Sequence, residues 1–355
     1  MTKQIDDVRI RGIKPLMAPD ILIEDLPVNE LQNQTIADGR DEIARILTGE
    51  DDRLVVIAGP CSIHDPEAGL DYARRLATVR ERVSADLCIV MRVYFEKPRT
   101  TVGWKGLIND PYLDGSFKIR DGLRRARRFL LDVTDLGLPT GSEFLDPIMP
   151  QFYADLVSWG AIGARTTESQ VHRELASGLS MPVGLKNGTY GTVQMASDGI
   201  GAAAGAHHFL SVTKQGVAGI VETDGNPYCH VILRGGSSGP NYDADSIARV
   251  EDQLENAGLP VRVMVDCSHA NSGKNHENQP LVAENLAGQI ADGNKSIFGL
   301  MMESFLLDGN QPHSQAQGSE GLVYGQSITD KCMSWERAEP LYDMLAEAVR
   351  KRRDR

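Results

Sequence analysis

Short apolar runs alternate with longer amphipathic stretches along most of the chain. The runs are continuously apolar rather than alternating in polarity, which is typical of parallel strands covered on both faces. Between them, apolar side chains recur at spacings of three and four, as in residues 72–83, and this spacing predicts amphipathic helices. The runs that we expect to be strands are residues 54–59, 87–93, 140–144, 161–164, 183–186, 230–234, 261–266 and 297–302. Eight strand–helix units in succession predict an α/β protein of the (β/α)8 TIM-barrel class.

Two segments do not follow this repeat. Residues 1–50 precede the first strand, and we interpret them as an N-terminal extension for regulation or oligomerisation, with a helix near residues 36–47. Residues 207–225 contain two further strand-like runs with no helical stretch between them, so we predict an inserted β-hairpin. Residues 51–355, with this hairpin inserted, would then form the catalytic barrel.

Composition and charge exclude several classes of protein. The 355 residues carry a formal net charge of −12, which argues against a general affinity for nucleic acid or for an anionic membrane surface. The basic run at 350–353 falls at the end of a helical pattern, where cations complement the helix dipole. No apolar run approaches the length of a membrane-spanning helix. The five cysteines are odd in number and form no CxxC pair, so we expect a reducing, cytoplasmic location.

Reactive side chains follow the expected strands at their C-terminal ends, where the active site of such a barrel lies. Cys61 follows the first strand, His269 follows the seventh, Glu303 follows the eighth, and Asp330 lies on the loop beyond it. A thiolate, an imidazole and carboxylates at one mouth predict a divalent-metal site. Taken singly, each residue is better explained as a small buried side chain, a loop histidine or a helix cap. Their shared position favours the metal.

Cations gather at the same strand ends, although the chain as a whole is acidic. An arginine presents a planar fork to a carboxylate or phosphate, and a lysine adds a point charge. For one such residue a surface salt bridge is the better explanation, but six at successive strand ends predict a site for small anionic substrates. The six are Arg92, Lys97, Arg99, Arg165, Lys186 and Arg234. Glu143, at the end of the third strand, is the remaining candidate acid or base.

Several of these strand ends belong to longer motifs. They read GPCSIHD at 59–65, RVYFEKPRTTVGWKG at 92–106, GARTTE at 163–168, KNGT at 186–189, LRGG at 233–236 and SITD at 327–330. With these motifs the chain resembles the microbial class I 3-deoxy-D-arabino-heptulosonate-7-phosphate (DAHP) synthases over nearly its whole length. That family condenses phosphoenolpyruvate with erythrose 4-phosphate, the first step of the shikimate pathway of aromatic amino acid biosynthesis.

The resemblance implies a role for most of the candidate residues. Cys61, His269, Glu303 and Asp330 would hold the divalent metal, which could be Mn, Fe, Co, Zn or Cu. Phosphoenolpyruvate would be bound by Arg92, Lys97, Ala164, Arg165, Lys186 and Arg234. The phosphate of erythrose 4-phosphate would be bound by Arg99 and Thr100, and the catalytic residues would be Lys97, Glu143, Lys186 and His269. Tyr190 stands where the family commonly has aspartate, which puts in doubt a hydrogen bond near the fifth strand end.

The resemblance also implies regulation by an aromatic amino acid, away from the active site. The corresponding positions are Asp6, Asp7, Gln151, Leu179, Ser180, Phe209, Ser211 and Val221. Ser211 is similar to the residue of phenylalanine-sensitive enzymes, where tyrosine-sensitive ones tend to have glycine, so phenylalanine is the expected inhibitor. An unregulated enzyme with the same hairpin is the competing interpretation. Family likeness further implies a homodimer or homotetramer.

Two other functions fit parts of the pattern. An enzyme like 3-deoxy-octulosonate-8-phosphate synthase would use a five-carbon aldose phosphate, but the KPRTT loop at 97–101 and the N-terminal extension favour the four-carbon substrate. A non-catalytic aromatic amino acid sensor could retain the barrel alone. Such a sensor would be free to lose ligands, whereas this chain retains every metal and anion position of the family pattern.

Overall fold

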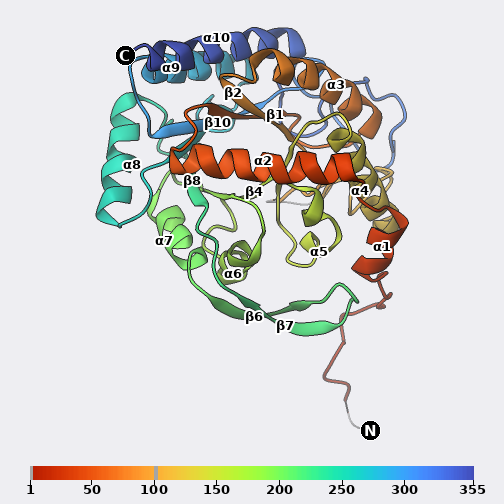
Figure 1. Ribbon diagram of the computed structural model, residues 1–355. Coiled ribbons are helices and arrows are strands. Elements are labelled where there is room, and N and C mark those ends of the chain that lie inside the picture. The colour runs from red at the N-terminus through yellow and green to blue at the C-terminus, as the bar shows by residue number, and fades with distance from the viewer. Residues whose placement is uncertain (1–2, 100–102) are drawn as a thin grey trace.

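Eight parallel strands close into a barrel in the computed structural model, which describes residues 3–99 and 103–355. Around the barrel the strands follow the order β1, β10, β9, β8, β5, β4, β3, β2, and helices surround them (Figure 1). The strands are β1 (Leu54–Gly59), β2 (Leu87–Arg92), β3 (Thr140–Glu143), β4 (Trp159–Ile162), β5 (Val183–Lys186), β8 (Cys229–Leu233), β9 (Val263–Asp266) and β10 (Ile297–Glu303). All of their residues are buried, which explains the continuous apolar runs. The predicted (β/α)8 barrel is confirmed.

Strand β4 differs most from its expected range of 161–164. It begins two residues earlier, because Trp159 and Gly160 pair with Gly141 and Ser142 of β3, and it ends at Ile162. A glycine beside a large aromatic residue weakens the apolar pattern in the sequence, although both are buried in the sheet. Strands β1 and β5 have the expected bounds, and the others differ from the expectation by one or two residues at one or both ends.

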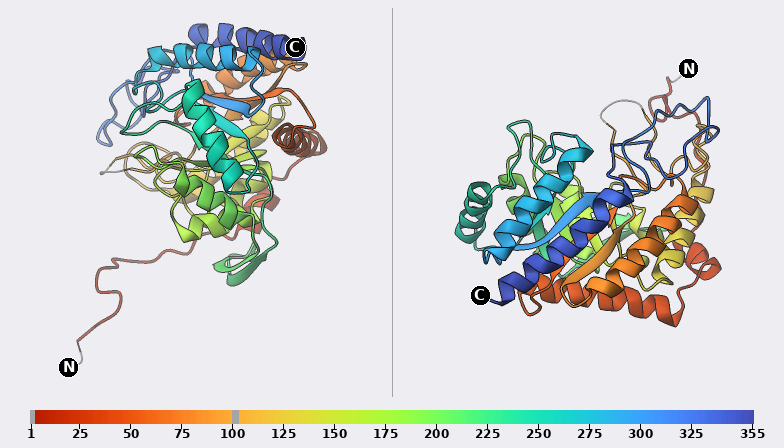
Figure 2. Two further views of the ribbon diagram at one scale, coloured as in Figure 1. Left: turned by 90° about the vertical axis from the view of Figure 1, so that its left-hand side faces the viewer. Right: turned by 90° about the horizontal axis from the view of Figure 1, so that it is seen from above.

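Helices cover the outside of the barrel. The longer ones are α2 (Glu30–Thr48), α3 (Pro66–Val83), α4 (Ile119–Thr134), α6 (Gln170–Gly178), α7 (Gln194–Ala203), α8 (Ala244–Asn256), α9 (Gln279–Ala291) and α10 (Trp335–Arg353). Short ones are α1 (Pro19–Asp25), α5 (Pro150–Tyr153), η1 (Ala154–Leu156) and η2 (His276–Asn278). The two views of Figure 2 show α9 and α10 side by side, consistent with their many contacts. None of the helices in the described ranges is both long and apolar enough to cross a lipid bilayer.

Helix α2 of the N-terminal extension covers one end of the barrel. Its apolar residues Ile43, Ile46 and Leu47 join a buried cluster with side chains of the barrel interior, so this end is plugged. In Figure 1 the helix runs across the front of the barrel. The expected helix near 36–47 begins earlier, at Glu30, because Asn29 and Gln32 form a capping box there. With its other end closed, the barrel opens at the C-terminal ends of its strands.

The predicted hairpin lies outside the barrel. Strands β6 (His207–Val212) and β7 (Ala218–Thr223) pair antiparallel in a separate two-stranded sheet, with Leu210 opposite Ile220. The arm before α1 passes the hairpin and continues away from the barrel (Figures 1 and 2). The hairpin and the N-terminal arm therefore lie away from the open end of the barrel.

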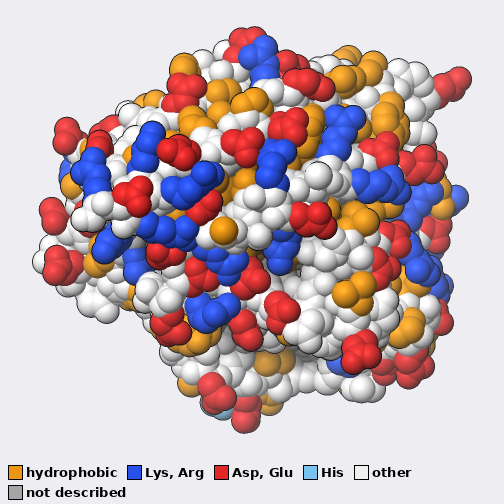
Figure 3. All heavy atoms as spheres, turned by 45° about the horizontal axis from the view of Figure 1, so that its top comes forward, with side chains coloured by type: hydrophobic (Ala, Val, Ile, Leu, Met, Phe, Trp, Pro, Cys, Tyr) orange, Lys and Arg blue, Asp and Glu red, His pale blue; other side chains and the backbone are white. Residues whose placement is uncertain are grey.

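The surface around α10 carries both signs of charge. The space-filling view in Figure 3 shows acidic and basic side chains interspersed on that face. Of the basic run at 350–353, Arg350 lies 3.0 Å from a carboxylate oxygen of Asp86, and Arg353 lies 2.6 Å from Asp86 and from Asp52. These ion pairs support the interpretation of the run as a helix end and not as a nucleic-acid patch.

Candidate active site

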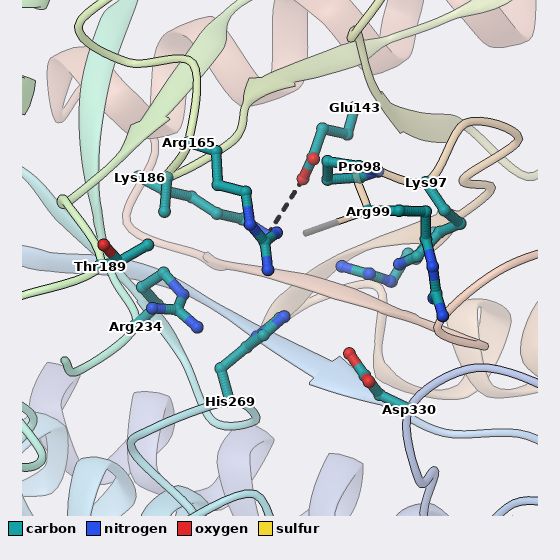
Figure 4. Close-up of a pocket in the computed structure, with 12 residues that line it drawn as sticks. Lys97, Pro98, Arg99, Glu143, Arg165, Lys186, Thr189, Arg234, His269 and Asp330 are labelled. Carbon is teal, nitrogen blue, oxygen red and sulfur yellow. Dashed lines mark ion pairs between the residues drawn. The ribbon is translucent and has the colours of Figure 1, made fainter. Parts of the chain in front are cut away.

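The C-terminal ends of the strands surround a pocket of about 270 Å³. It is lined by Arg92, Lys97, Pro98, Arg99, Glu143, Ala164, Arg165, Lys186, Thr189, Arg234, His269 and Asp330. All six cations expected at the strand ends are among them, together with Ala164. Figure 4 shows the labelled cations pointing into the pocket from different sides: Lys97 and Arg99 lie on one side, and Arg165, Lys186 and Arg234 lie on the other. Thr100 lies outside the described residues.

A second cavity, of about 650 Å³, continues from this pocket. The two share Arg165, Thr189, Arg234, His269 and Asp330, and the second also reaches Glu303. The mouth is therefore large enough for two small substrates lying side by side.

Three of the four expected metal ligands come together beside the pocket. Cys61 follows β1, Glu303 ends β10 and Asp330 lies on the loop before α10, and one ligand atom from each lies within 4.8 Å of the others. Metal–ligand bonds of about 2.0–2.3 Å separate ligand atoms by up to about 4.5 Å, so the trio needs little adjustment to share a cation. His269 is not part of this trio at that spacing, but its Nε2 lies 3.9 Å from Glu303 Oε1.

The donor chemistry also fits a divalent cation. Burial, assisted by the neighbouring Glu303, raises the pKa of the Cys61 thiol to about 11. Such a thiol ionises at neutral pH only when a strong positive charge lies against it, as a metal ion would. In contrast, the pKa of Asp330 lies below its usual value, because Lys97 and His269 outweigh the effect of its burial.

Asp266, the last residue of β9, orients His269. Its Oδ2 lies 2.9 Å from His269 Nδ1, and the carboxyl group is fully buried. Burial alone would raise its pKa, but His269, Lys186 and Arg92 bring it well below the usual value. The Ser268 hydroxyl also lies 2.9 Å from Nδ1 and donates to the other carboxylate oxygen of Asp266, so Nδ1 is occupied from this side and Nε2 is left as the free ligand atom. His269 itself adopts a φ of 56°, a left-handed backbone conformation that a histidine keeps only where its surroundings hold it.

Arg92 contacts two of the three candidate metal ligands and is also one of the six cations that line the pocket. Its Nη2 donates to Glu303 Oε1 at 2.8 Å and to the backbone oxygen of Cys61 at 3.2 Å, and its Nε donates to the backbone oxygen of Pro60 at 3.1 Å. Lys97 lies close by, with Nζ 3.1 Å from Cys61 Sγ. The same two cations therefore contact two of the candidate metal ligands, Glu303 and Cys61, and also line the pocket.

Glu143 and Lys186 form a buried ion pair on the opposite wall. The two side chains are 3.2 Å apart, marked by the dashed line in Figure 4, and Lys186 Nζ lies 3.6 Å from Asp266. Burial favours the neutral acid, but Lys186, Lys97 and Arg92 bring the pKa of Glu143 below its usual value. Glu143 is therefore a carboxylate at neutral pH, available to accept a proton.

A different cavity, of about 500 Å³, lies under the hairpin. Six of the eight expected regulatory residues line it, namely Gln151, Leu179, Ser180, Phe209, Ser211 and Val221. Asp6 and Asp7 do not, because the arm that carries them runs away from its own barrel and leaves both exposed (Figure 1). Arg40, Lys214 and Asp155 add charge to the cavity wall.

Tyr190, the departure from the family pattern, does not enter the pocket. Its side chain is 75 % exposed, and its backbone oxygen accepts a hydrogen bond from Ser238 Oγ at 2.9 Å. The neighbouring Thr189 lines both mouth cavities instead. The substitution therefore leaves the ligand trio and the cations intact.

Fold and site together define an enzyme barrel for small anionic substrates, with a candidate metal centre at its mouth. The sequence model of the DAHP synthetase I family matches residues 27–342, and the chain belongs to that family. It is 58% identical to the phenylalanine-sensitive phospho-2-dehydro-3-deoxyheptonate aldolase of Escherichia coli K12, over 99% of this chain and 100% of that one. The phenylalanine-inhibited enzyme of Saccharomyces cerevisiae is 52% identical, over 99% and 96% of the two chains, and the tyrosine-inhibited enzyme of Schizosaccharomyces pombe is 55% identical, over 99% and 95%.

A solved structure agrees with the fold. The phospho-2-dehydro-3-deoxyheptonate aldolase of Francisella tularensis SCHU S4 superposes with a TM-score of 0.94, at 50% identity, over 97% of this chain and 99% of that one. The predicted family membership is confirmed.

Proposed function

We propose that the chain catalyses the condensation of phosphoenolpyruvate with erythrose 4-phosphate to DAHP and inorganic phosphate, the first step of the shikimate pathway. One observation carries the proposal: three candidate metal ligands lie beside a pocket that six cationic side chains line, at the open end of the barrel. The chain belongs to the DAHP synthetase I family. Both substrates are phosphorylated, and one also carries a carboxylate, which matches the excess of cations in an acidic chain.

The cations divide between the two substrates. Phosphoenolpyruvate would be bound by Arg92, Lys97, Arg165, Lys186 and Arg234, with the backbone at Ala164. Arg99, further out on the same wall as Lys97, would bind the aldose phosphate, with Thr100 expected to assist. Charge-assisted contacts of this kind orient the reacting carbon atoms and preorganise the site electrostatically.

Cys61, Glu303 and Asp330, with Nε2 of His269, would hold the divalent cation. Bound there, the cation would supply Lewis-acid stabilisation at the aldehyde oxygen. The ligand set suits Mn, Fe, Co, Zn or Cu.

The chain's own groups handle the remaining steps. The C2=C3 electron pair of phosphoenolpyruvate forms a bond to the aldehyde carbon, whose oxygen takes up a proton from solvent water and becomes a hydroxyl. Water adds at C2 and gives up a proton, which the Glu143 carboxylate on the pocket wall would accept. The bond between C2 and the phosphate oxygen then breaks, its electron pair leaving with the phosphate, while the C2 hydroxyl gives its proton to the departing phosphate and becomes the ketone of the keto acid. Lys97 and Lys186 hold the negative charge of the substrate throughout.

A turnover assay tests the proposal. Purified protein with both substrates should release phosphate in step with a seven-carbon keto acid, chelator should abolish the reaction, and added divalent metal should restore it. Full activity of a metal-free protein in chelator would overturn the metal-dependent mechanism, and absence of phosphate release would overturn the function. Comparing turnover on four-carbon and five-carbon aldose phosphates distinguishes the octulosonate-type alternative. An amino acid sensor would bind phenylalanine without any turnover.

We further propose that phenylalanine inhibits the enzyme by binding in the cavity under the hairpin. The cavity offers an aromatic wall at Phe209 and cations at Arg40 and Lys214 for a carboxylate. Because the arm with Asp6 and Asp7 points away from its own cavity, these two residues would serve the cavity of a neighbouring copy in a homodimer or homotetramer. A cytoplasmic location fits such a biosynthetic enzyme.

A further inference from the structure

Three cations of the mouth share one aromatic ring. Arg92 Cζ lies 3.5 Å from the centroid of the Tyr94 ring, Lys186 Nζ lies 5.5 Å from it and Lys97 Nζ lies 5.9 Å from it. All three distances are within the range of a cation–π attraction, about 6 Å. Tyr94 follows β2 by two residues and is 1 % exposed, so its ring lies beneath the pocket and not on its surface.

The hydroxyl group of Tyr94 makes only a weak hydrogen bond. It donates to Met301 Sδ at 3.9 Å, and a thioether sulfur is a weak acceptor. Burial raises the pKa of Tyr94, so the phenol stays uncharged. What the residue offers to its neighbours is therefore the negative face of the ring.

Each of the three cations also has an acidic group at its side. Arg92 lies 2.8 Å from Glu303 and Lys186 lies 3.2 Å from Glu143, while Lys97 lies 3.1 Å from the sulfur of Cys61, a thiol that would become anionic on binding a metal. A further carboxylate in the position of Tyr94 would neutralise the cations and repel an anionic substrate. An aromatic ring attracts the same cations through its quadrupole but adds no net charge.

Arg92 illustrates the result. Of its five N–H groups, those on Nε and Nη2 donate to Pro60, Cys61 and Glu303, and one on Nη1 donates to Met301 Sδ at 2.9 Å. Among the described residues these contacts leave one N–H of Nη1 for a ligand. The ring stacked at 3.5 Å fixes the plane of the guanidinium group and hence the direction of that N–H.

We propose that Tyr94 is a positioning residue: its ring holds Arg92, Lys97 and Lys186 together beneath the substrate anion without neutralising them. The inference rests on the proposed function in taking phosphoenolpyruvate as that anion. Tyr94 would then act through the negative face of its ring, in addition to filling space in the barrel interior.

Graded fluorination separates electrostatics from packing. Phenylalanine and its mono-, di- and trifluoro derivatives at position 94 keep nearly the same shape, while each fluorine weakens the negative face of the ring. We expect the Kd for phosphoenolpyruvate, measured by calorimetry with Mn²⁺ present, to rise stepwise by roughly tenfold over the series. The KM for phosphoenolpyruvate should rise in parallel, and the KM for the aldose phosphate should stay constant.

Two further variants and a control complete the test. Tyr94→Leu removes the ring and should weaken phosphoenolpyruvate binding at least as much as trifluorination, whereas Tyr94→Phe should recover most of that loss. If Tyr94→Leu fails to fold, the fluorinated series still decides. The same fluorinated residues at Phe129, a buried ring packed edge-to-face on Phe95, serve as the matched control.

A flat Kd across the Tyr94 series, or an equal trend in the Phe129 series, would overturn the inference. Wild-type protein that binds phosphoenolpyruvate but forms no product would instead overturn the proposed function, because the binding measurement does not depend on turnover.

Discussion

Asp266 Oδ2 lies 2.9 Å from Nδ1 of His269, three residues further along the chain, and this contact aims Nε2 of the imidazole toward Glu303. The carboxylate is buried behind the histidine and does not line the pocket. In the proposed metal site this arrangement would be that of a histidine ligand backed by an acid, which fixes the tautomer and raises the basicity of the free nitrogen.

Asp266→Asn should therefore weaken metal binding by on the order of 10- to 100-fold, because the amide no longer supplies a negative charge behind the imidazole. Competition with a chromophoric chelator measures the affinity directly. Asp292→Asn, which changes an exposed carboxylate at the end of α9, is the matched control. Wild-type metal affinity in Asp266→Asn would show that Asp266 does not support metal binding through His269.

Glu143→Gln should lower kcat by on the order of 10²- to 10⁴-fold, because the amide cannot accept the proton of the attacking water. The affinity for phosphoenolpyruvate should be retained or increased, since an anion has been removed from beside Lys186. Steady-state kinetics together with calorimetry resolve the two effects. An unchanged kcat with a higher KM would make Glu143 a binding group and not a base.

Arg99→Ala should raise the KM for erythrose 4-phosphate by on the order of 10- to 100-fold, the usual effect of losing a hydrogen bond to a charged group. Arg234→Ala should show the reverse selectivity and weaken phosphoenolpyruvate, because Arg234 lies on the other side of the pocket (Figure 4). The KM of each variant is measured for both substrates, so that each variant serves as the control for the other. Equal effects of both variants on both substrates would contradict the division of cations.

Glu96 should make stability depend on pH. Burial, with a contribution from Asp146, raises its pKa to about 8, so between its ordinary value of 4.5 and about 8 the folded chain binds a proton that the unfolded chain does not. Stability then falls as the pH rises through this window, by up to about 1.4 kcal/mol per pH unit. His64 and His230, whose pKa values burial lowers to about 4, act with the opposite sign below their ordinary value of 6.5.

The effect of Glu96 is therefore clearest between pH 6.5 and 8. Glu96→Gln should flatten the slope there, while its amide oxygen can still accept a hydrogen bond from Tyr153, whose hydroxyl lies 3.2 Å from Glu96. Denaturant unfolding at several pH values measures the free energy. Parallel slopes for the two proteins would show that Glu96 is ionised in the folded state.

Ser211→Gly should weaken inhibition by phenylalanine and strengthen inhibition by tyrosine, because it enlarges the cavity under the hairpin where a phenol would need space. Inhibition curves for both amino acids, each referred to turnover without inhibitor, measure the change. An unaltered preference would place the selectivity elsewhere in the cavity.

The hydrophobic pattern predicts the barrel and the hairpin, because burial on both faces leaves a direct trace in the sequence. It misplaces β4, where Trp159 and Gly160 lie in the sheet but interrupt the apolar run. It also misses the start of α2, where the capping box of Asn29 and Gln32 was the available signal.

The strand-end rule brings the expected cations and ligands to one mouth, since every parallel strand delivers its last residues to the same edge. It assigns no role to Asp266, the last residue of β9, or to Tyr94. Both are buried supports whose roles depend on distances across the barrel, although the spacing of Asp266 and His269 could have suggested their contact. Nor does it show that Asp6 and Asp7 lie apart from the other expected regulatory positions, because no local sequence pattern predicts the direction of the N-terminal arm.

The hairpin β6–β7 hydrogen-bonds as its own two-stranded sheet, and the eight barrel strands close without it. Changes in the hairpin need not move the strand ends, so under the proposed inhibition the sensitivity to different end products could diverge while the chemistry is retained. Relatives of similar identity that bear phenylalanine-inhibited and tyrosine-inhibited names fit this separation. If phenylalanine binds under this hairpin as proposed, the sensor is attached outside the closed barrel and can evolve separately from the catalytic site.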